Sequence, residues 1–142
     1  MSTWQIQRDI NNLTNGLHTI TRNIHKYKNT RTHLQHIRQN HQTNLRTLDF
    51  SYNQIRRRGL SPVKQIGAFE GEMANTLTSL VTNGLADIEH AMNATKAVSR
   101  AIDNQINKLN VKITNLEREV TMQNLQIQNR RRDLAMANRR RR

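Results

Sequence analysis

The feature that most constrains the fold of this 142-residue chain is a heptad pattern of apolar residues in its first third. From Ile6 onward, apolar residues recur in alternating steps of four and three, as in a coiled coil. They are Ile6, Ile10, Leu13, Leu17, Ile20, Ile24 and Tyr27. The same steps lead on to Arg31, Leu34, Arg38, His41, Leu45, Leu48, Tyr52 and Ile55. The pattern predicts one long helix whose apolar seam needs a second helix beside it.

The last third of the chain repeats the pattern. Its heptad residues are Ile102, Ile106, Leu109, Ile113, Leu116 and Val120. Before them the steps are irregular, and the expected stripe consists of Met73, Leu77, Leu80, Leu85, Ile88, Met92 and Val98. Asn83-Gly84 interrupts this stripe, and because glycine costs about 1 kcal/mol relative to alanine in a helix, a bend there is plausible. Gly16 lies inside the strong first pattern and is expected to be tolerated.

Between the two patterns lies a signal for one helix to stop and another to start. Arg56–Arg58 suit the negative end of a helix dipole. Gly59 can cap that end, and Ser61-Pro62 offers an N-cap followed by a helix-starting proline. The sequence therefore predicts an all-α fold of two long antiparallel helices, a hairpin or coiled coil with its break near 59–61 and a bend permitted at 83–84. The alternative is a straight parallel oligomer in which the break is only a kink.

The predicted organisation is a single elongated helical-hairpin domain over residues 1–138. Its parts are helix one at about 3–58, a turn at 59–61, helix two at about 62–137 and a basic tail at 139–142. The composition suits a narrow seam rather than a thick core, because only 35% of the residues are hydrophobic and 4% aromatic.

The net charge is +13 and is concentrated toward the two ends of the chain. Residues 1–60 carry +8, residues 61–99 carry −2, and residues 100–142 carry +7. Such a surface attracts polyanions or an acidic protein partner.

Cysteine is absent, which excludes disulfides and thiolate metal sites. The first ten residues lack the apolar segment of a secretory signal, and no apolar run is long enough to span a membrane. We therefore expect a cytoplasmic chain, with export by a route that needs no cleaved signal left open.

No catalytic or metal-binding pattern stands out, so the sequence predicts neither an enzyme nor a cofactor. His18, His25, His33 and His36 lie on outer heptad positions, and no carboxylate lies between residues 10 and 48 to complete a metal site with them. The carboxylates form no pair suited to acid–base catalysis, and no nucleophile motif or phosphate-binding glycine loop is present.

Arg31, Arg38 and His41 place three polar side chains in the seam of helix one. Polar seam residues cost stability but can fix register or partner choice. Two alternatives remain: the helices splay there and these side chains reach water, or acidic groups of a partner face them.

Arginine clusters are candidate polyanion-binding residues. They are Arg56, Arg57, Arg58, Arg130, Arg131, Arg132, Arg139, Arg140, Arg141 and Arg142. Contacts with phosphates would make such binding steeply salt-dependent, but the stacking aromatics of an RNA-binding domain are missing. A purely solubilising tail is the alternative.

The segment that follows the break reads Phe69-Glu70-Gly71-Glu72-Met73-Ala74, and Leu77 comes next among the apolar residues. This aromatic-x-Gly arrangement resembles the Trp-x-Gly turn of the small WXG-superfamily proteins exported by type VII secretion systems. It is still more similar to their longer relatives, the helical accessory proteins encoded beside LXG polymorphic toxins. "INKLNVKITNL" resembles the seam of their second helix.

The resemblance implies a role for each matching residue. Phe69 and Gly71 would pack the bend, and Ala74 and Leu77 would make the first contacts of helix two. Family members pair with the N-terminal helical domain of the toxin and present it for export. Phenylalanine stands here in place of tryptophan, and arginines replace the C-terminal export signal, so the expectation concerns pairing more than secretion of this chain.

The leading hypothesis is thus a non-enzymatic adaptor that pairs with a larger helical protein, such as an LXG-type toxin. The expected partner-binding seam consists of Ile10, Leu13, Leu17, Ile20, Ile24, Ile102, Ile106, Leu109, Ile113 and Leu116. The alternatives are a basic coiled-coil protein that binds nucleic acid non-specifically and a phage or virion structural coiled coil. A homo-oligomer is compatible with each of them.

Overall fold

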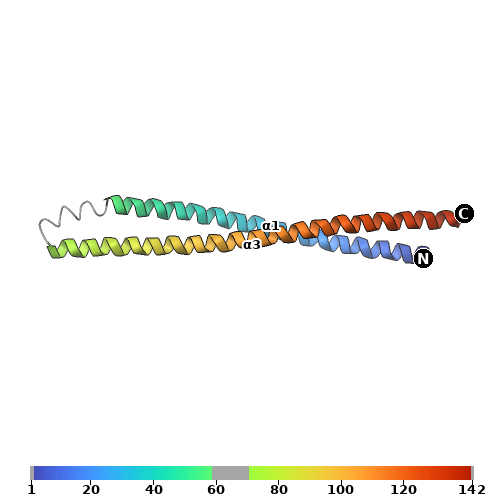
Figure 1. The fold of residues 1–142 in the computed structure, drawn as a ribbon, viewed down its shortest axis with the longest axis horizontal. Coiled ribbons are helices and arrows are strands. Elements are labelled where there is room, and N and C mark those ends of the chain that lie inside the picture. The colour runs from blue at the N-terminus through green and yellow to red at the C-terminus, as the bar shows by residue number, and fades with distance from the viewer. Residues whose placement is uncertain (1, 59–70, 142) are drawn as a thin grey trace. The chain divides into compact units, whose positions relative to one another are not determined.

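The computed structural model describes residues 2–58 and 71–141, with side chains except those of 71–74. Two helices account for these residues: α1 spans Thr3–Arg58 and α3 spans Gly71–Arg140 (Figure 1). Wherever the helices contact each other they run antiparallel, because Asp9, Lys28 and Arg38 of α1 meet Arg130, Glu117 and Asp103 of α3 in turn. The predicted all-α fold of two long packed helices is confirmed. The turn predicted at 59–61 lies outside the described residues.

The N-terminus of α1 has its own cap. The Gln5 amide donates to Ser2 Oγ at 3.1 Å, and the Ser2 amide donates to Gln5 Oε1 at 3.0 Å. This reciprocal pair is a capping box, which satisfies two amides that the first helical turn leaves without partners. It explains why α1 begins at Thr3, the start that the sequence predicts.

Threonine is abundant in both helices although its branched side chain lowers helix propensity. Nine threonine hydroxyls donate to the carbonyl oxygen four residues earlier, a local bond that lets the residue remain helical. They belong to Thr14, Thr19, Thr21, Thr30, Thr32, Thr43, Thr47, Thr95 and Thr121.

The heptad pattern predicted for α1 matches its burial. Every position of the pattern from Ile6 to Tyr52 is buried or half-buried, and Ile55, at 37% exposed, lies just outside it. His18, His25, His33 and His36 are exposed, as their outer positions predict. We call these heptad positions, together with their counterparts on α3, the seam.

On α3 the seam is longer and more regular than the sequence analysis expects. It keeps alternating steps of four and three through Val81, Leu85, Ile88, Met92, Thr95, Ser99, Ile102, Ile106, Leu109, Ile113, Leu116, Val120, Gln123, Ile127, Arg130, Leu134 and Ala137. Leu80 and Val98 were expected in the stripe but are 62% and 43% exposed. That expectation was wrong because Thr95 and Ser99 occupy the seam. The helix also continues through Asn83-Gly84 without a break.

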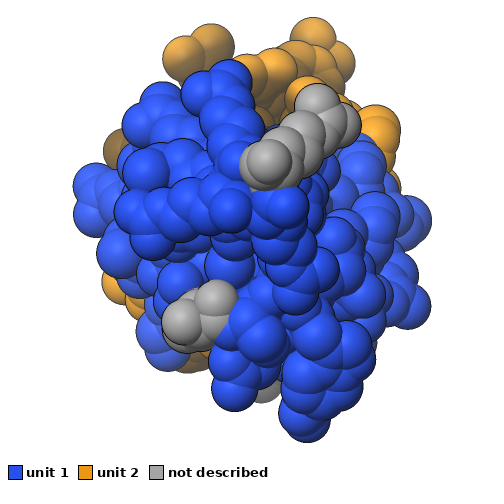
Figure 2. Space-filling model, turned by 90° about the vertical axis from the view of Figure 1, so that its right-hand side faces the viewer, with its two compact units in different colours: residues 1–33, 106–142 blue, residues 34–105 orange. Residues whose placement is uncertain are grey.

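The described chain forms two compact units, each made of one segment of α1 and one of α3 (Figure 2). Unit 1 comprises residues 1–33 and 106–142, and unit 2 comprises residues 34–105. Eight described residues are buried, all of them isoleucines, and seven lie in unit 1: Ile6, Ile10, Ile20, Ile24, Ile106, Ile113 and Ile127. In unit 2 only Ile102 is buried, and the other seam residues are half-buried. Unit 1 therefore has the better-packed core.

No part of either described helix is long and apolar enough to cross a membrane.

Candidate interaction site

The seam residues expected to bind a partner face the chain's own other helix. In unit 1, Ile20, Ile24 and Ile113 form one buried cluster, with the half-buried Tyr27, Leu116 and Val120 packed against it. The other expected seam residues are also buried or half-buried: Ile10, Leu13, Leu17, Ile102, Ile106 and Leu109. The seam therefore holds the hairpin together, and a partner has to use other surfaces or the exposed edges of the seam.

Two of the polar seam residues find partners within the chain. In unit 1, Arg31 Nη1 donates to Asn110 Oδ1 at 2.9 Å. In unit 2, Arg38 Nη1 lies 3.2 Å from Asp103 Oδ1, an ion pair whose side chains are 36% and 50% exposed. Arg38 thus meets an acid, as one alternative expects, but the acid belongs to the same chain. Because water screens such a pair, we assign it a role in register rather than a large stability.

His41 behaves differently, and it has a counterpart on α3. His41 Nδ1 and Ser99 Oγ are both buried in unit 2 and have no hydrogen-bond partner among the described residues. The register that pairs Arg38 with Asp103 brings the two residues to about the same level of the seam. Buried polar atoms without partners destabilise a packed interface, which agrees with the looser packing of unit 2.

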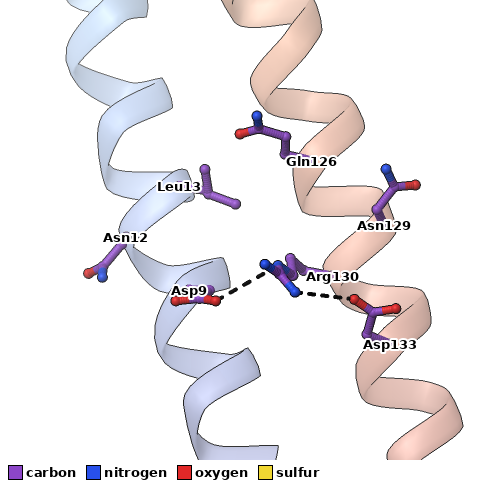
Figure 3. A pocket seen from close by; sticks show the side chains of 7 residues that line it. All are labelled: Asp9, Asn12, Leu13, Gln126, Asn129, Arg130 and Asp133. Atoms are coloured by element: carbon purple, nitrogen blue, oxygen red, sulfur yellow. Dashed lines mark hydrogen bonds and ion pairs between the residues drawn. The ribbon is translucent and has the colours of Figure 1, made fainter. Parts of the chain in front are cut away.

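A pocket opens between the helices in unit 1, near the chain ends (Figure 3). Arg130 lies at its centre, with Nε 3.8 Å from Asp9 Oδ2 and Nη1 3.4 Å from Asp133 Oδ2. The remaining lining residues are Asn12, Leu13, Gln126 and Asn129. The charges of the pocket neutralise one another, so the network serves to join α1 to α3 rather than to perform chemistry.

Further along unit 1, lysines bridge the two helices. Lys28 Nζ lies 3.5 Å from Glu117 Oε1. Lys112 Nζ lies 4.4 Å from the centroid of the Tyr27 ring, within the range of a cation–π contact. Lys112 lowers the pKa of the Tyr27 phenol, mainly through a hydrogen bond and also through its charge, while partial burial opposes the shift.

The residues of the turn motif are only partly within the described chain. Phe69 lies outside it, Gly71 is the first residue of α3, and Ala74 lies in the first turns of that helix. Leu77 is half-buried. The described residues therefore leave the packing of the bend as an expectation.

The candidate polyanion-binding arginines are mostly exposed. Arg56–Arg58 end α1, and Arg131, Arg132 and Arg139–Arg141 lie exposed near the end of α3. Arg130 instead takes part in the ion pairs of the pocket, and Arg142 lies outside the described residues. No group of three or more His, Asp and Glu side chains in the described chain is arranged to hold a metal ion.

Apolar side chains also lie on the outer surfaces, where sequence analysis did not look for a site. The described large hydrophobic residues that are exposed are Trp4, Ile37, Phe50, Ile55, Leu80, Val98, Val111, Met122, Leu125 and Met136. Four of them recur on α3 within unit 1: Val111, Met122, Leu125 and Met136. Their fourteen-residue repeat was the available signal, but it lies outside the seam register on which that analysis concentrated.

The charge is also uneven between the units. By sequence, unit 1 carries fifteen basic and four acidic side chains, whereas unit 2 carries eight and six. Unit 1 therefore accounts for +11 of the net charge of +13.

Comparison with protein-family models, curated proteins and solved structures finds no match to this chain. The functional argument therefore rests on the residues and their arrangement.

Proposed function

We propose that this protein is a non-enzymatic helical adaptor that pairs with a larger helical protein. The observation that carries the proposal is the imbalance between buried and exposed apolar side chains. Eight described residues are buried, whereas ten large hydrophobic ones are exposed. A two-helix hairpin has only one internal interface, so apolar residues on its outer surfaces gain burial only from another molecule.

The resemblance to the accessory proteins of LXG toxins supplies the kind of partner. It rests on the turn motif around Phe69 and Gly71 and on the seam of residues 106–116. On this proposal the partner is the N-terminal helical domain of an LXG-type toxin, which the adaptor presents for type VII export.

The test is affinity purification of the tagged protein from its native host, with nuclease and a wash at about 0.5 M salt. At that ionic strength the screening length is only about 4–5 Å, so contacts between exposed arginines and phosphates are largely released. We expect a helical protein to remain bound in a fixed ratio and to be identified by mass spectrometry. Deletion of residues 139–142 should leave that complex intact.

The charge of unit 1 favours a second candidate function, which is non-specific binding of nucleic acid. The exposed arginines near the end of α3 would contact phosphates. This candidate predicts that only nucleic acid co-purifies, that salt or nuclease removes it, and that deletion of residues 139–142 weakens binding. That result would contradict the adaptor proposal.

A further inference from the structure

One face of α3 in unit 1 combines apolar and cationic side chains in a regular repeat. It lies opposite the seam, at positions two and five residues beyond the seam residues Ile106, Ile113, Val120, Ile127 and Leu134. All of its members are exposed. We call it the outer face; it consists of Lys108, Val111, Asn115, Arg118, Met122, Leu125, Asn129, Arg132, Met136 and Arg139.

The apolar members of the outer face are spaced like contacts for another helix. Val111 and Leu125 are separated by two heptads, as are Met122 and Met136. Their exposed fractions are 61%, 55%, 61% and 53%, respectively. A heptad spacing brings side chains back to the same side of a helix in a coiled coil, so a helix lying along this face would meet each of them in turn.

The charged members all have the same sign. Lys108, Arg118, Arg132 and Arg139 belong to the face, and no acidic residue does. Neither Arg118 nor Arg132 has a hydrogen-bond or ion-pair partner among the described residues. The nearby acids Glu117 and Asp133 are instead paired with Lys28 and Arg130. The outer face therefore offers unpaired positive charge beside apolar side chains.

A shallow hollow on this surface is lined by Asn110, Val111, Thr114, Asn115 and Arg118. Four of these residues follow the spacing of a coiled-coil hole, which receives a single side chain from a facing helix. An apolar side chain placed there would contact Val111, and an acidic neighbour would reach Arg118.

We infer that the outer face binds an acidic amphipathic helix of the partner protein. This inference rests on the proposed adaptor function and assigns its binding surface. The partner helix would place leucine-like residues against Met122 and Leu125 and carboxylates beside Arg118 and Arg132. A membrane surface fits less well, because Asn115, Asn129 and the arginines interrupt the continuous apolar face that an interfacial helix needs. Nucleic acid would use the cations but not the methionines and leucine.

The test is a titration of the full chain with a fluorescein-labelled peptide of about four heptads. The peptide carries leucine at the a and d positions and glutamate at e and g, so that its copies repel one another. Leu125→Glu is compared with Leu80→Glu, a matched change at another exposed leucine of α3, which lies in unit 2. Arg118→Glu is compared with Arg100→Glu in the same way.

We expect Leu125→Glu and Arg118→Glu to weaken peptide binding about tenfold or more, because each removes a central contact and adds repulsion. Leu80→Glu and Arg100→Glu should change it by less than about twofold. Circular dichroism should show equal helix content in all four variants, since the substituted side chains are exposed. Equal affinity for all four variants would overturn the inference.

Two further outcomes separate this inference from other readings. If Leu125→Glu weakens binding to vesicles of phosphatidylserine and phosphatidylcholine more than binding to the peptide, the face is a membrane surface and the inference is wrong. If the native-host purification yields a partner that Leu125→Glu retains as well as Leu80→Glu does, the adaptor function stands but this face is not its site. If no protein partner is found while the peptide still discriminates the variants, the adaptor function fails and the binding property of the face remains.

Discussion

Ile113 and Val111 lie two residues apart on α3, and the side of the helix that each occupies decides its contribution to stability. Ile113 is 3% exposed in the seam, whereas Val111 is 61% exposed on the outer face. We expect Ile113→Ala to lower the free energy of unfolding by about 2–4 kcal/mol and Val111→Ala to change it by less than about 0.5 kcal/mol. Urea denaturation followed by circular dichroism measures both. Equal losses would mean that the seam is misplaced.

Gln123 is a polar residue at a seam position of unit 1. Its Oε1 is buried and has no hydrogen-bond partner among the described residues. Replacing such a group with an apolar one of similar size removes a desolvation cost, so Gln123→Leu should stabilise the chain by about 1–2 kcal/mol. The exposed Gln128 provides the control, because Gln128→Leu should have almost no effect. A loss of stability in Gln123→Leu would show that the amide has a partner after all.

Tyr27 reports on its contact with Lys112. Because Lys112 lowers the pKa of Tyr27, Lys112→Met should raise that pKa toward its ordinary value. While Lys112 keeps its proton, the stability that this contact contributes is gained as the pH rises through the pKa of folded Tyr27 and lost as the pH falls. An ultraviolet titration in a Tyr52→Phe background isolates the Tyr27 signal. An unchanged titration in Lys112→Met would contradict the contact.

At the scale of a whole helix, Gly84 tests the continuity of α3. An added Cβ there meets no atom within 4 Å, and the helix continues through this residue. Gly84→Ala should therefore stabilise the chain by about 0.5–1 kcal/mol through helix propensity alone. Gly16→Ala should gain less, because its Cβ would lie 3.3 Å from Gln123 Oε1. Thermal melting compares them; destabilisation by Gly84→Ala would indicate a functional bend.

The helices also show what could be read from the sequence. The pattern from Ile6 to Tyr27 predicted the seam of α1 because the branched and apolar residues there fall only on seam positions. On α3 the analysis followed apolar residues and therefore chose Leu80 and Val98, although Thr95 and Ser99 occupy the seam. A residue's type alone cannot distinguish a seam threonine from an outer one. The register, extended backward from Ile102, would have done so.

The interaction site was harder to predict than the fold. The sequence analysis assigned the seam to a partner, whereas the structure closes it within the chain. Arg38 illustrates the reason: an unpaired cation in a seam suggests an external acid until the antiparallel register places Asp103 beside it. The outer face could be recognised only once the seam of α3 was known through to Ala137.

At the scale of the whole molecule, closure of the seam within one chain is what leaves the outer face for a partner. A parallel oligomer would instead fill the seam with other copies, each residue facing its equivalent. The charge distribution adds to this account, since unit 1 combines +11 of the net charge with the outer face. Attraction of an acidic partner to unit 1 should therefore weaken as salt rises, while its apolar contacts persist.

The central claim, that one chain closes its own seam, can be tested by cross-linking because the natural chain has no cysteine. Arg31→Cys combined with Asn110→Cys places thiols at two residues whose side chains now hydrogen-bond across unit 1. A short thiol-specific cross-linker should join them within one chain and leave a monomer on a denaturing gel. Arg31→Cys alone should give no cross-linked dimer. Efficient dimer formation by that single variant would show equivalent seams facing each other and would contradict the account.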